Sequence, residues 1–194
     1  APLGSRHPIH PNDDVNVSQS SNDTIVTAMH IAAYRMTTRL TLPALGRLQS
    51  ALADKSAQWM SVVKVGRTHL QDATPLTVGQ EWSGYAAALA DAIDFVEYAT
   101  QGLLPLAMGG TAVGTGLNAP AGFDVEVAAV IAELTGDPFV SAPNKFAAQA
   151  TLDRVVRAHS ALKATAVTLF KIANDMRWLG SGPRAGLMEI NFPA

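Results

Sequence analysis

The sequence of 194 residues predicts an all-α fold, an elongated bundle of long helices. Apolar residues recur at the three- and four-residue spacing of a helical face along most of the chain. Only 15% of the residues are charged and alanine is used heavily, which is typical of helices that are apolar around much of their circumference. No segment alternates apolar and polar residues for long enough to predict a sheet.

The first helix is expected over about residues 22–61, and Pro43 kinks it or divides it in two. One face of this helix carries the apolar residues Met29, Ala32, Ala33, Met36 and Leu40. The second helix is expected over about residues 77–104 and stops before Pro105. It has a similar apolar stripe, formed by Trp82, Tyr85, Leu89, Ile93, Val96 and Leu103.

A shorter third helix is expected over residues 122–135, where Asp124 caps the first turn and Gly136 ends the helix. The fourth and longest covers residues 144–179 and stops at the sequence SGP. At about 1.5 Å per residue it would be about 50 Å long. Long helices with short polar connectors predict one elongated helical domain over residues 10–194, preceded by a linker or expression remnant at residues 1–9.

Composition and charge exclude several classes of function. The net charge is −2, and no run of Lys or Arg provides a basic footprint for nucleic acid. The chain has no cysteine, so disulfides, thiolate zinc sites and cysteine nucleophiles are excluded. No apolar run reaches the roughly 18 residues of a membrane span, and no signal peptide is visible. A cytoplasmic protein is therefore expected.

The polar run SQSSND, residues 18–23, leads directly into the first helix. In the simpler interpretation, Ser21 or Asn22 accepts a hydrogen bond from the first free backbone N–H groups of that helix. Capping does not explain why Ser18 and Ser20 crowd the same end. Because a helix N-terminus carries free N–H groups and partial positive charge, the cluster also suits a bound carboxylate or phosphate.

The stretch GRTHLQDATP, residues 66–75, places one histidine in an expected loop. A lone histidine is more often a hydrogen-bonded structural residue than a catalyst. His69 nevertheless follows the hydroxyl of Thr68. Asp72 or Glu81 is expected to orient the ring so that its other nitrogen is free to take a proton.

Three other motifs favour structural roles. HPNDD, residues 10–14, lacks a second well-spaced pair of metal ligands, so a turn in which Asn12 and Asp13 bond nearby backbone is favoured. GGTAVGTG lacks the Lys-Ser/Thr of a phosphate-binding loop and is expected to be a tight connector that permits close helix packing. A buried polar network is expected from Asn174, Asp175 and Arg177 in KIANDMRWLGSGPRAG.

Read in order, these motifs closely resemble the class II fumarases. Family-like sequence is found, in the family's order, in HPNDDVNVSQSSND, GRTHLQDATPLTVGQE, GGTAVGTGLN, PNKF and KIANDMRWLGSGPRAG. The resemblance covers essentially the whole chain after about His10. It implies a helical lyase of the fumarase/aspartase superfamily, a homotetramer around a shared helix core whose active sites combine loops from three subunits.

The resemblance also implies roles for individual residues. Fumarate- or malate-binding residues of the family are matched by Ser20, Ser21, Asn22 and Thr68. His69 looks like the histidine that takes part in water activation and proton transfer. A secondary dicarboxylate site of the family is matched by His10, Pro11, Asn12 and Asp13. Family members commonly carry an Arg three residues before that His, a position held here by His7, with Arg6 one residue earlier.

The implied reaction is the reversible hydration of fumarate to L-malate. It requires two carboxylates to be held, a water to be deprotonated and a carbanion to be stabilised. Hydroxyls and amides at a helix start provide preorganised donors for the carboxylates, and an imidazole can accept and donate the proton. No metal or organic cofactor is needed for this chemistry.

Two alternatives stay open, an aspartate ammonia-lyase and a helical oligomerisation module without catalysis. Aspartases typically read SQSTND, GRTQLQDA and GATAIGTG, so Ser21, His69 and Gly110 imply hydration, although GLMEINFP looks somewhat more aspartase-like. The family's loop GSSxMPGKxNP, which carries a catalytic serine and a substrate-binding lysine, and its N-terminal domain are not in the sequence. The 194-residue chain alone is therefore expected to have little or no hydratase activity.

Overall fold

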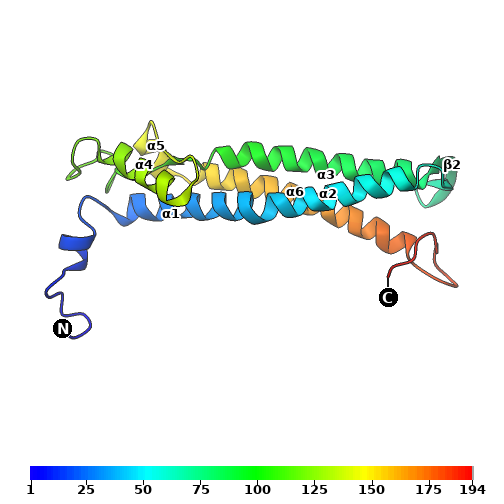
Figure 1. Cartoon of the computed structure of the whole chain (residues 1–194), viewed down its shortest axis with the longest axis horizontal. Helices are drawn as coiled ribbons and strands as arrows, with labels where there is room; N and C mark the ends of the chain where they lie inside the picture. Colours follow the sequence, from blue (N-terminus) through cyan, green and yellow to red (C-terminus); the bar gives the residue numbers. More distant parts are fainter. Residues whose placement is uncertain (194) are drawn as a thin grey trace. The chain divides into compact units, whose positions relative to one another are not determined.

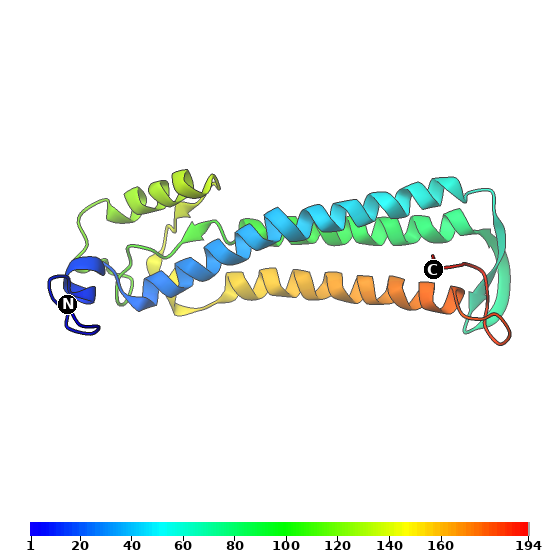
Figure 2. The ribbon, with the colours of Figure 1, turned by 60° about the horizontal axis from the view of Figure 1, so that its bottom comes forward.

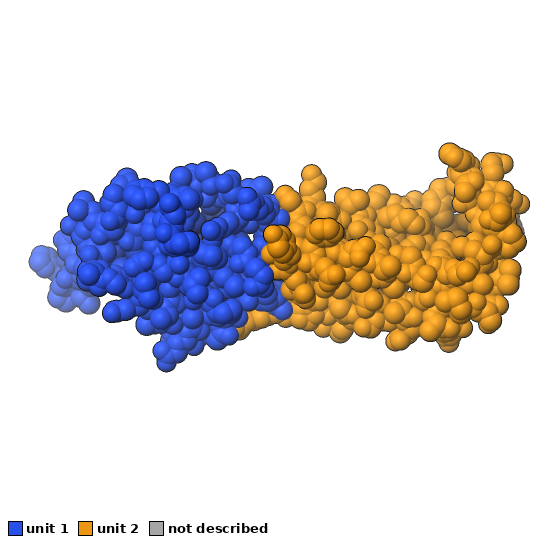
Figure 3. All heavy atoms as spheres, turned by 90° about the horizontal axis from the view of Figure 1, so that it is seen from above, with its two compact units in different colours: residues 1–38, 99–158 blue, residues 39–98, 159–194 orange. Residues whose placement is uncertain are grey.

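The computed structural model describes residues 1–193 of the chain. They divide into two compact units, each made of two segments of the chain (Figure 3). Unit 1 comprises residues 1–38 and 99–158, and unit 2 comprises residues 39–98 and those from 159 onward. Helices dominate both units, so the predicted all-α helical class is confirmed. Within residues 1–193, no helix combines the length and the hydropathy that crossing a bilayer requires.

Unit 1 packs helices around two short strands. Its helical elements are η1 (Pro11–Val15, a π-helical turn), α1 (Ser21–Met36), α4 (Phe123–Thr135) and α5 (Lys145–Ala150). The strands β3 (Pro105–Leu106) and β4 (Val140–Ser141) pair in parallel. Figure 1 shows α4 and α5 near the start of α1, and α1 and α5 are in contact. The buried apolar residues of this unit form two clusters: Tyr34, Leu103, Leu106, Phe139 and Ala158, and Val26, Ala107, Ala142 and Ala148.

In unit 2 an antiparallel hairpin connects two long helices (Figure 2). The chain order is α2 (Leu42–Gln58), β1 (Val63–Thr68), β2 (Gln71–Thr77) and α3 (Val78–Gln101). The third helix is α6 (Asp153–Leu179), of which residues from 159 onward belong to this unit. The three helices share one buried apolar cluster, which includes Leu45, Leu52, Trp82, Tyr85, Leu89, Ile172 and Leu179. The apolar stripe predicted for the second helix is thus confirmed along α3.

Two of the expected helices are divided. The first is interrupted by a π-helical turn, η2 (Thr37–Thr41), and Pro43 lies in the first turn of α2, as a helix start permits. The fourth is split into α5 and α6, because Thr151 adopts an extended conformation with φ −141° and ψ 162°. A β-branched residue favours this conformation more than the helical one.

The apolar face expected along α1 and η2 is only partly right: Ala33 packs against a buried cluster, but the longer side chains do not. Met36 and Leu40 are each 59% exposed, whereas Val26, His30 and Tyr34 are buried. The buried face includes polar residues because backbone groups elsewhere in unit 1 satisfy their side chains. The ring of His30, for example, lies 3.0 Å from the carbonyl oxygen of Leu103. A pattern that counts only apolar residues selects the wrong side of such a helix.

The start of α4 also differs from the expectation. Gly136 ends the helix in the left-handed conformation as predicted, with φ 69°. Asp124 does not cap the first turn. Its carboxylate accepts a hydrogen bond from the Ser141 hydroxyl at 2.5 Å and forms an ion pair with Lys145 at 3.3 Å. The hydrogen bond from Ser141, with that from Lys145, lowers the pKa of Asp124 despite partial burial. A lysine is a stronger partner for a carboxylate than backbone N–H groups are.

The β1–β2 hairpin corrects the expectation that the chain contains no sheet. Its ladder pairs Thr68 with Gln71, so His69 and Leu70 form a two-residue turn with φ values of 52° and 61°. Positive φ at both central residues is the mark of a type I′ turn, which usually contains Asn and Gly. No turn signal therefore marks this hairpin in the sequence. The alternation of apolar and polar residues that marks a strand is also missing from the sequence. Lys64 and Arg67 occupy half-buried positions, where they form ion pairs.

Candidate functional site

The first candidate site lies at the start of α1. Ser20 is the N-cap residue, rather than Ser21 or Asn22 as expected. Its Oγ accepts a hydrogen bond from the backbone N–H of Asn22 at 3.2 Å. Asp23 completes a capping box by accepting a hydrogen bond from the backbone N–H of Ser20 at 3.0 Å. Because Ser20 provides the cap, the side chains of Ser21 and Asn22 are not used for it.

Asp23, which adjoins the candidate site, has contacts that the sequence did not predict. Its side chain is completely buried. The second carboxylate oxygen, Oδ2, accepts hydrogen bonds from the backbone N–H groups of Gly109 at 3.2 Å and Thr111 at 2.8 Å. The spacing S-x-x-D in SSND is a capping-box signal that could have revealed the bond to Ser20. Nothing in that spacing indicates the bonds to the glycine-rich segment.

A pocket of about 600 Å³ opens beside the first turns of α1, and we call it the α1 pocket. Its lining includes Ser21, Asn22, Met29, Ala112, Phe146 and Gln149. The Asn22 side-chain amide donates to the Ala112 carbonyl oxygen at 2.8 Å. The Gln149 amide donates to the Thr111 carbonyl oxygen at 2.7 Å. The pocket is therefore lined by a few polar groups among mostly apolar residues, as is typical of sites for small molecules.

Two buried oxygen atoms beside this pocket are unsatisfied. Within the part of the chain that the structure describes, the Oε1 atom of Gln149 and the Oγ1 atom of Thr111 have no hydrogen-bond partner. Gln149 lies in α5 and was not singled out in the sequence, because no motif distinguishes it. Burying an unpaired oxygen costs free energy, so each such group needs an explanation.

The segment GGTAVGTG, residues 109–116, is the expected tight connector. Gly109 has φ 89°, and a Cβ atom there would lie 2.3 Å from the Asp124 Cβ. Gly114 has φ 100°, and a Cβ atom there would lie 3.0 Å from the Phe146 backbone nitrogen. Side chains at these positions would prevent the segment from lying against α4 and α5. Its glycines thus bring the Ala112 carbonyl to Asn22.

Thr68 and His69 lie at the tip of the hairpin in unit 2, whereas Ser20, Ser21 and Asn22 belong to unit 1. Both hairpin residues are exposed. The expectation that Asp72 or Glu81 orients the His69 ring is wrong within this chain. Glu81 pairs with Lys64, Nζ to Oε2, at 2.6 Å, and no described residue makes a hydrogen bond with the imidazole of His69.

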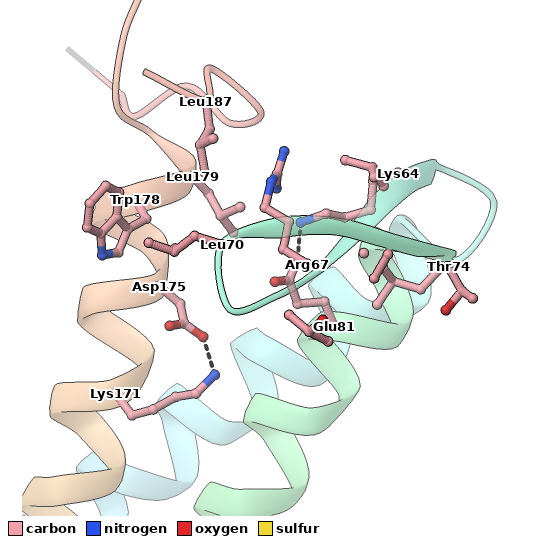
Figure 4. Close-up of a pocket in the computed structure, with 15 residues that line it drawn as sticks. Lys64, Arg67, Leu70, Thr74, Glu81, Lys171, Asp175, Trp178, Leu179 and Leu187 are labelled. Atoms are coloured by element: carbon pink, nitrogen blue, oxygen red, sulfur yellow. Dashed lines mark hydrogen bonds and ion pairs between the residues drawn. The ribbon is translucent and has the colours of Figure 1, made fainter. Parts of the chain in front are cut away.

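A second pocket, of about 500 Å³, lies along the β1–β2 hairpin (Figure 4). Lys64 and Arg67 of β1 enter it beside Glu81 of α3. The carboxylate of Glu189 pairs with Lys64 at 2.6 Å and with Arg67 at 2.5 Å. Burial alone would raise the pKa of Glu189, but hydrogen bonds from Arg67 and Lys64 outweigh it and hold the pKa below its usual range. The charges in this pocket are thus mutually compensated.

The expected buried network of Asn174, Asp175 and Arg177 is wrong in composition. Only Asp175 is in a described network, where it accepts a hydrogen bond from the Tyr85 hydroxyl at 2.9 Å and pairs with Lys171. Arg177 is exposed. Burial, together with the nearby carboxylates of Glu81 and Asp175, raises the pKa of the Tyr85 hydroxyl. Tyr85 therefore remains a neutral hydrogen-bond donor in the helix packing.

The segment His10, Pro11, Asn12 and Asp13 forms the start of η1. The bonding pattern is the reverse of that expected, because the side chains of His10 and Asp14 bond the backbone. His10 Nδ1 accepts hydrogen bonds from the N–H groups of Asn12 and Asp13 at 3.3 and 3.2 Å. Asp14 accepts one from the N–H of His10 at 2.6 Å. Across residues 1–193, no group of three or more His, Asp or Glu side chains is arranged to hold a metal ion.

The sequence matches a protein family described as lyase over residues 2–194. It is 60% identical over 192 residues to a class II fumarate hydratase of Methanosarcina acetivorans, covering 99% of this chain and 40% of that protein. A class II fumarate hydratase of Rhizobium meliloti is 58% identical over 191 residues, covering 98% of this chain and 41% of that protein. The chain thus spans about 40% of the length of these curated relatives.

Solved structures show the same similarity. The crystal structure of a class II fumarase from Schistosoma mansoni has a TM-score of 0.90 and 41% identity, covering 92% of this chain and 40% of that one. A fumarate lyase:delta crystallin from Brucella melitensis, bound to cobalt, has a TM-score of 0.92 and 39% identity, covering 100% of this chain and 42% of that one. At this identity and TM-score the helical arrangement is shared with both proteins.

Proposed function

Because the chain belongs to the lyase family, we propose that it is the central helical part of a class II fumarate hydratase, which adds water to fumarate to form L-malate. The observation that carries the proposal is the α1 pocket, where Ser21 and Asn22 line a cavity at a helix start. A helix N-terminus attracts anions, and hydroxyl and amide groups bind carboxylates. The names of the two curated relatives described above support the same reaction.

In this proposal residues 10–194 form the central helical domain and residues 1–9 a linker. The chain covers about 40% of its relatives' length, so the activity is assigned to the protein encoded by the complete reading frame. The enzyme acts in the cytoplasm, or in the mitochondrial matrix if the source is eukaryotic. It works as a homotetramer whose subunits share each active site.

Each site residue has a role in the proposed reaction. Ser20, Ser21, Asn22 and Thr68 bind the two carboxylates of fumarate. His69 takes part in removing a proton from water as the oxygen bonds to one alkene carbon. The electron pair moves to the other carbon and into its carboxylate, and a proton then completes malate. The exposed imidazole of His69 at a hairpin tip supports this role, since the ring is accessible to a neighbouring subunit.

A secondary dicarboxylate site at His10, Pro11, Asn12 and Asp13 is part of the proposal. The His10 ring is held by two backbone N–H groups, which leaves its Nε2 atom for a ligand. The position three residues earlier is His7 rather than the Arg common in the family. A dicarboxylate bound there would therefore need a different positively charged side chain. Arg6, which precedes His7 in the sequence, is the candidate.

The test is turnover by the complete protein. Loss of the ultraviolet absorbance of fumarate, with L-malate identified as the product, is the expected result. The same protein is assayed with fumarate and ammonia, and formation of aspartate at a higher rate than malate would instead establish an aspartase. Absence of both reactions in a folded oligomer would overturn the proposal in favour of an assembly module.

A further inference from the structure

The carboxylate of Asp23 is fully buried, yet it lies immediately after the residues proposed to bind substrate. It accepts three hydrogen bonds, all from backbone N–H groups: those of Ser20, Gly109 and Thr111. A buried carboxylate is costly unless its oxygens are paired. Here the pairing joins the first turn of α1 to a segment that lies 86 to 88 residues later in the chain.

The segment that Asp23 holds carries the carbonyl that orients Asn22. Gly109 and Thr111 donate to Asp23, and the next residue, Ala112, accepts from the Asn22 amide at 2.8 Å. One amide N–H of Asn22 is thereby used, so its second N–H and its oxygen have defined directions. Gly109 and Gly110 have little intrinsic rigidity, and the segment therefore depends on outside contacts for its position.

We propose that Asp23 is a positioning residue for the dicarboxylate site, and that it acts by fixing the glycine-rich segment against which Asn22 is oriented. The inference rests on the proposed function of Ser21 and Asn22. Asp23 itself does not touch the substrate, because it is completely buried behind the capping turn. The contact also holds the capping box closed, so one side chain sets both the helix start and the neighbouring carbonyl.

The variant Asp23→Asn in the complete protein tests this. Asparagine has the same shape, but one of its two terminal atoms is an N–H₂ group, so at least one of the three backbone donors loses its acceptor. We expect KM for fumarate to rise about tenfold, with kcat changed less, because substrate binding is impaired while the catalytic groups remain. A purely structural role would lower kcat with the folded fraction and leave KM unchanged, which would overturn the proposal.

Thr27→Val is the matched control. Thr27 is buried one turn further along α1, and its hydroxyl has no hydrogen-bond partner among the described residues. Valine has nearly the same shape, so KM should stay at the wild-type value. If both variants raise KM equally, Asp23 has no specific positioning role.

Amide hydrogen exchange separates this inference from the proposed function. In Asp23→Asn, residues 109–116 should exchange faster than in Thr27→Val, whether or not the protein turns over fumarate. Unchanged exchange there would refute the role of Asp23 even in an active enzyme. Accelerated exchange in a protein without fumarate turnover would refute the proposed function, but it would still show that Asp23 fixes the glycine-rich segment.

If Asp23→Asn does not fold, Gly110→Ala reports on the same segment from the side of α5. A Cβ atom at Gly110 would lie 2.1 Å from Gln149 Oε1, so the Gln149 amide must move away from the Thr111 carbonyl. KM should again rise about tenfold. Gly46→Ala, where nothing lies within 4 Å of the added Cβ, is its control. An unchanged KM in Gly110→Ala would count against the inference.

Discussion

His69 has a backbone conformation that few side chains favour. Its φ of 52° places it in the left-handed region, at the first position of a two-residue turn. Asparagine, aspartate and histidine tolerate this region better than most residues. The turn thus presents the ring at the tip of the hairpin, where it is exposed and free of partners within the described residues. The residue that the turn holds at a positive φ is thus the same residue that is proposed to transfer the proton.

The substitution His69→Asn separates these two properties. Asparagine suits a positive φ, so the free energy of unfolding should change by less than about 0.5 kcal/mol. In the complete protein the proposed hydration should slow by about 10²- to 10⁴-fold, because the amide does not exchange protons near neutral pH. Fumarate turnover and urea unfolding measure the two effects. Leu70→Asn, at the next turn position, is the control that should keep full activity.

A second residue-scale prediction concerns His30. Burial lowers the pKa of this histidine below its usual value, and hydrogen bonds to Leu103 and Pro105 offset only part of the effect. Below about pH 6.5 the unfolded chain therefore binds a proton that the folded protein does not, and stability falls as the pH decreases. His30→Asn should lower Tm overall but reduce its fall between about pH 7.5 and pH 5.5.

The control for this experiment is His159→Asn, at an exposed position of α6. Its Tm should follow the wild-type dependence on pH. If His30→Asn shows the same fall in Tm as the wild type, protonation of His30 does not couple to folding.

At the scale of elements, apolar periodicity predicted α3 well and α1 poorly. Trp82, Tyr85 and Leu89 face the core because this part of the core is apolar, and spacing alone reveals it. The buried face of α1 instead carries Asp23 and His30, whose partners lie on distant segments. The hairpin escaped prediction because its turn lacks Asn and Gly. Long-range partners and unusual turns are what a single sequence does not reveal.

The ion pairs that Glu189 forms with Lys64 and Arg67 of the hairpin lead to a prediction. Glu189→Gln removes the negative charge that Lys64 and Arg67 share and replaces one of the two acceptor oxygens with an NH₂ group, which should reduce the free energy of unfolding by about 1–3 kcal/mol at neutral pH. The pKa of Glu189 is lowered in the folded protein, so its contribution is present above the unfolded pKa and is lost as the pH falls through the folded one. The two proteins should therefore converge in acid.

Urea denaturation at neutral and acidic pH measures this difference. Glu97→Gln, at an exposed position of α3, should leave stability within about 0.5 kcal/mol at both values. A difference between Glu189→Gln and wild type that persists unchanged in acid would show that the side chain acts through packing rather than charge.

At the scale of the whole molecule, the candidate site is only partly predictable. Ser20, Ser21 and Asn22 adjoin in sequence, so their common location at a helix start follows from local rules. Gln149 was missed because its contact with the segment 109–116 depends on the fold. The motifs around Thr68 and His69 were visible in the sequence, but these residues belong to a different unit of the chain.

The proposed sharing of active sites between subunits predicts complementation. Asn22→Ala and His69→Asn should each inactivate the proposed homotetramer, because each damages every site. Unfolding and refolding the two variants together should restore fumarate turnover, since some sites then combine an intact Asn22 with an intact His69 from another chain. Each variant refolded alone is the control. Mixtures that stay inactive would show that both residues must come from the same subunit.

The bonds from Asp23 to Gly109 and Thr111 also have a consequence for the order of folding. Loops of this length close slowly relative to helix formation, because chain entropy opposes bringing distant segments together. During synthesis, α1 leaves the ribosome long before its partner segment exists. The carboxylate of Asp23 therefore remains hydrated until residues 109–111 have been made. The wall of the proposed pocket is completed only after much of the chain has been translated.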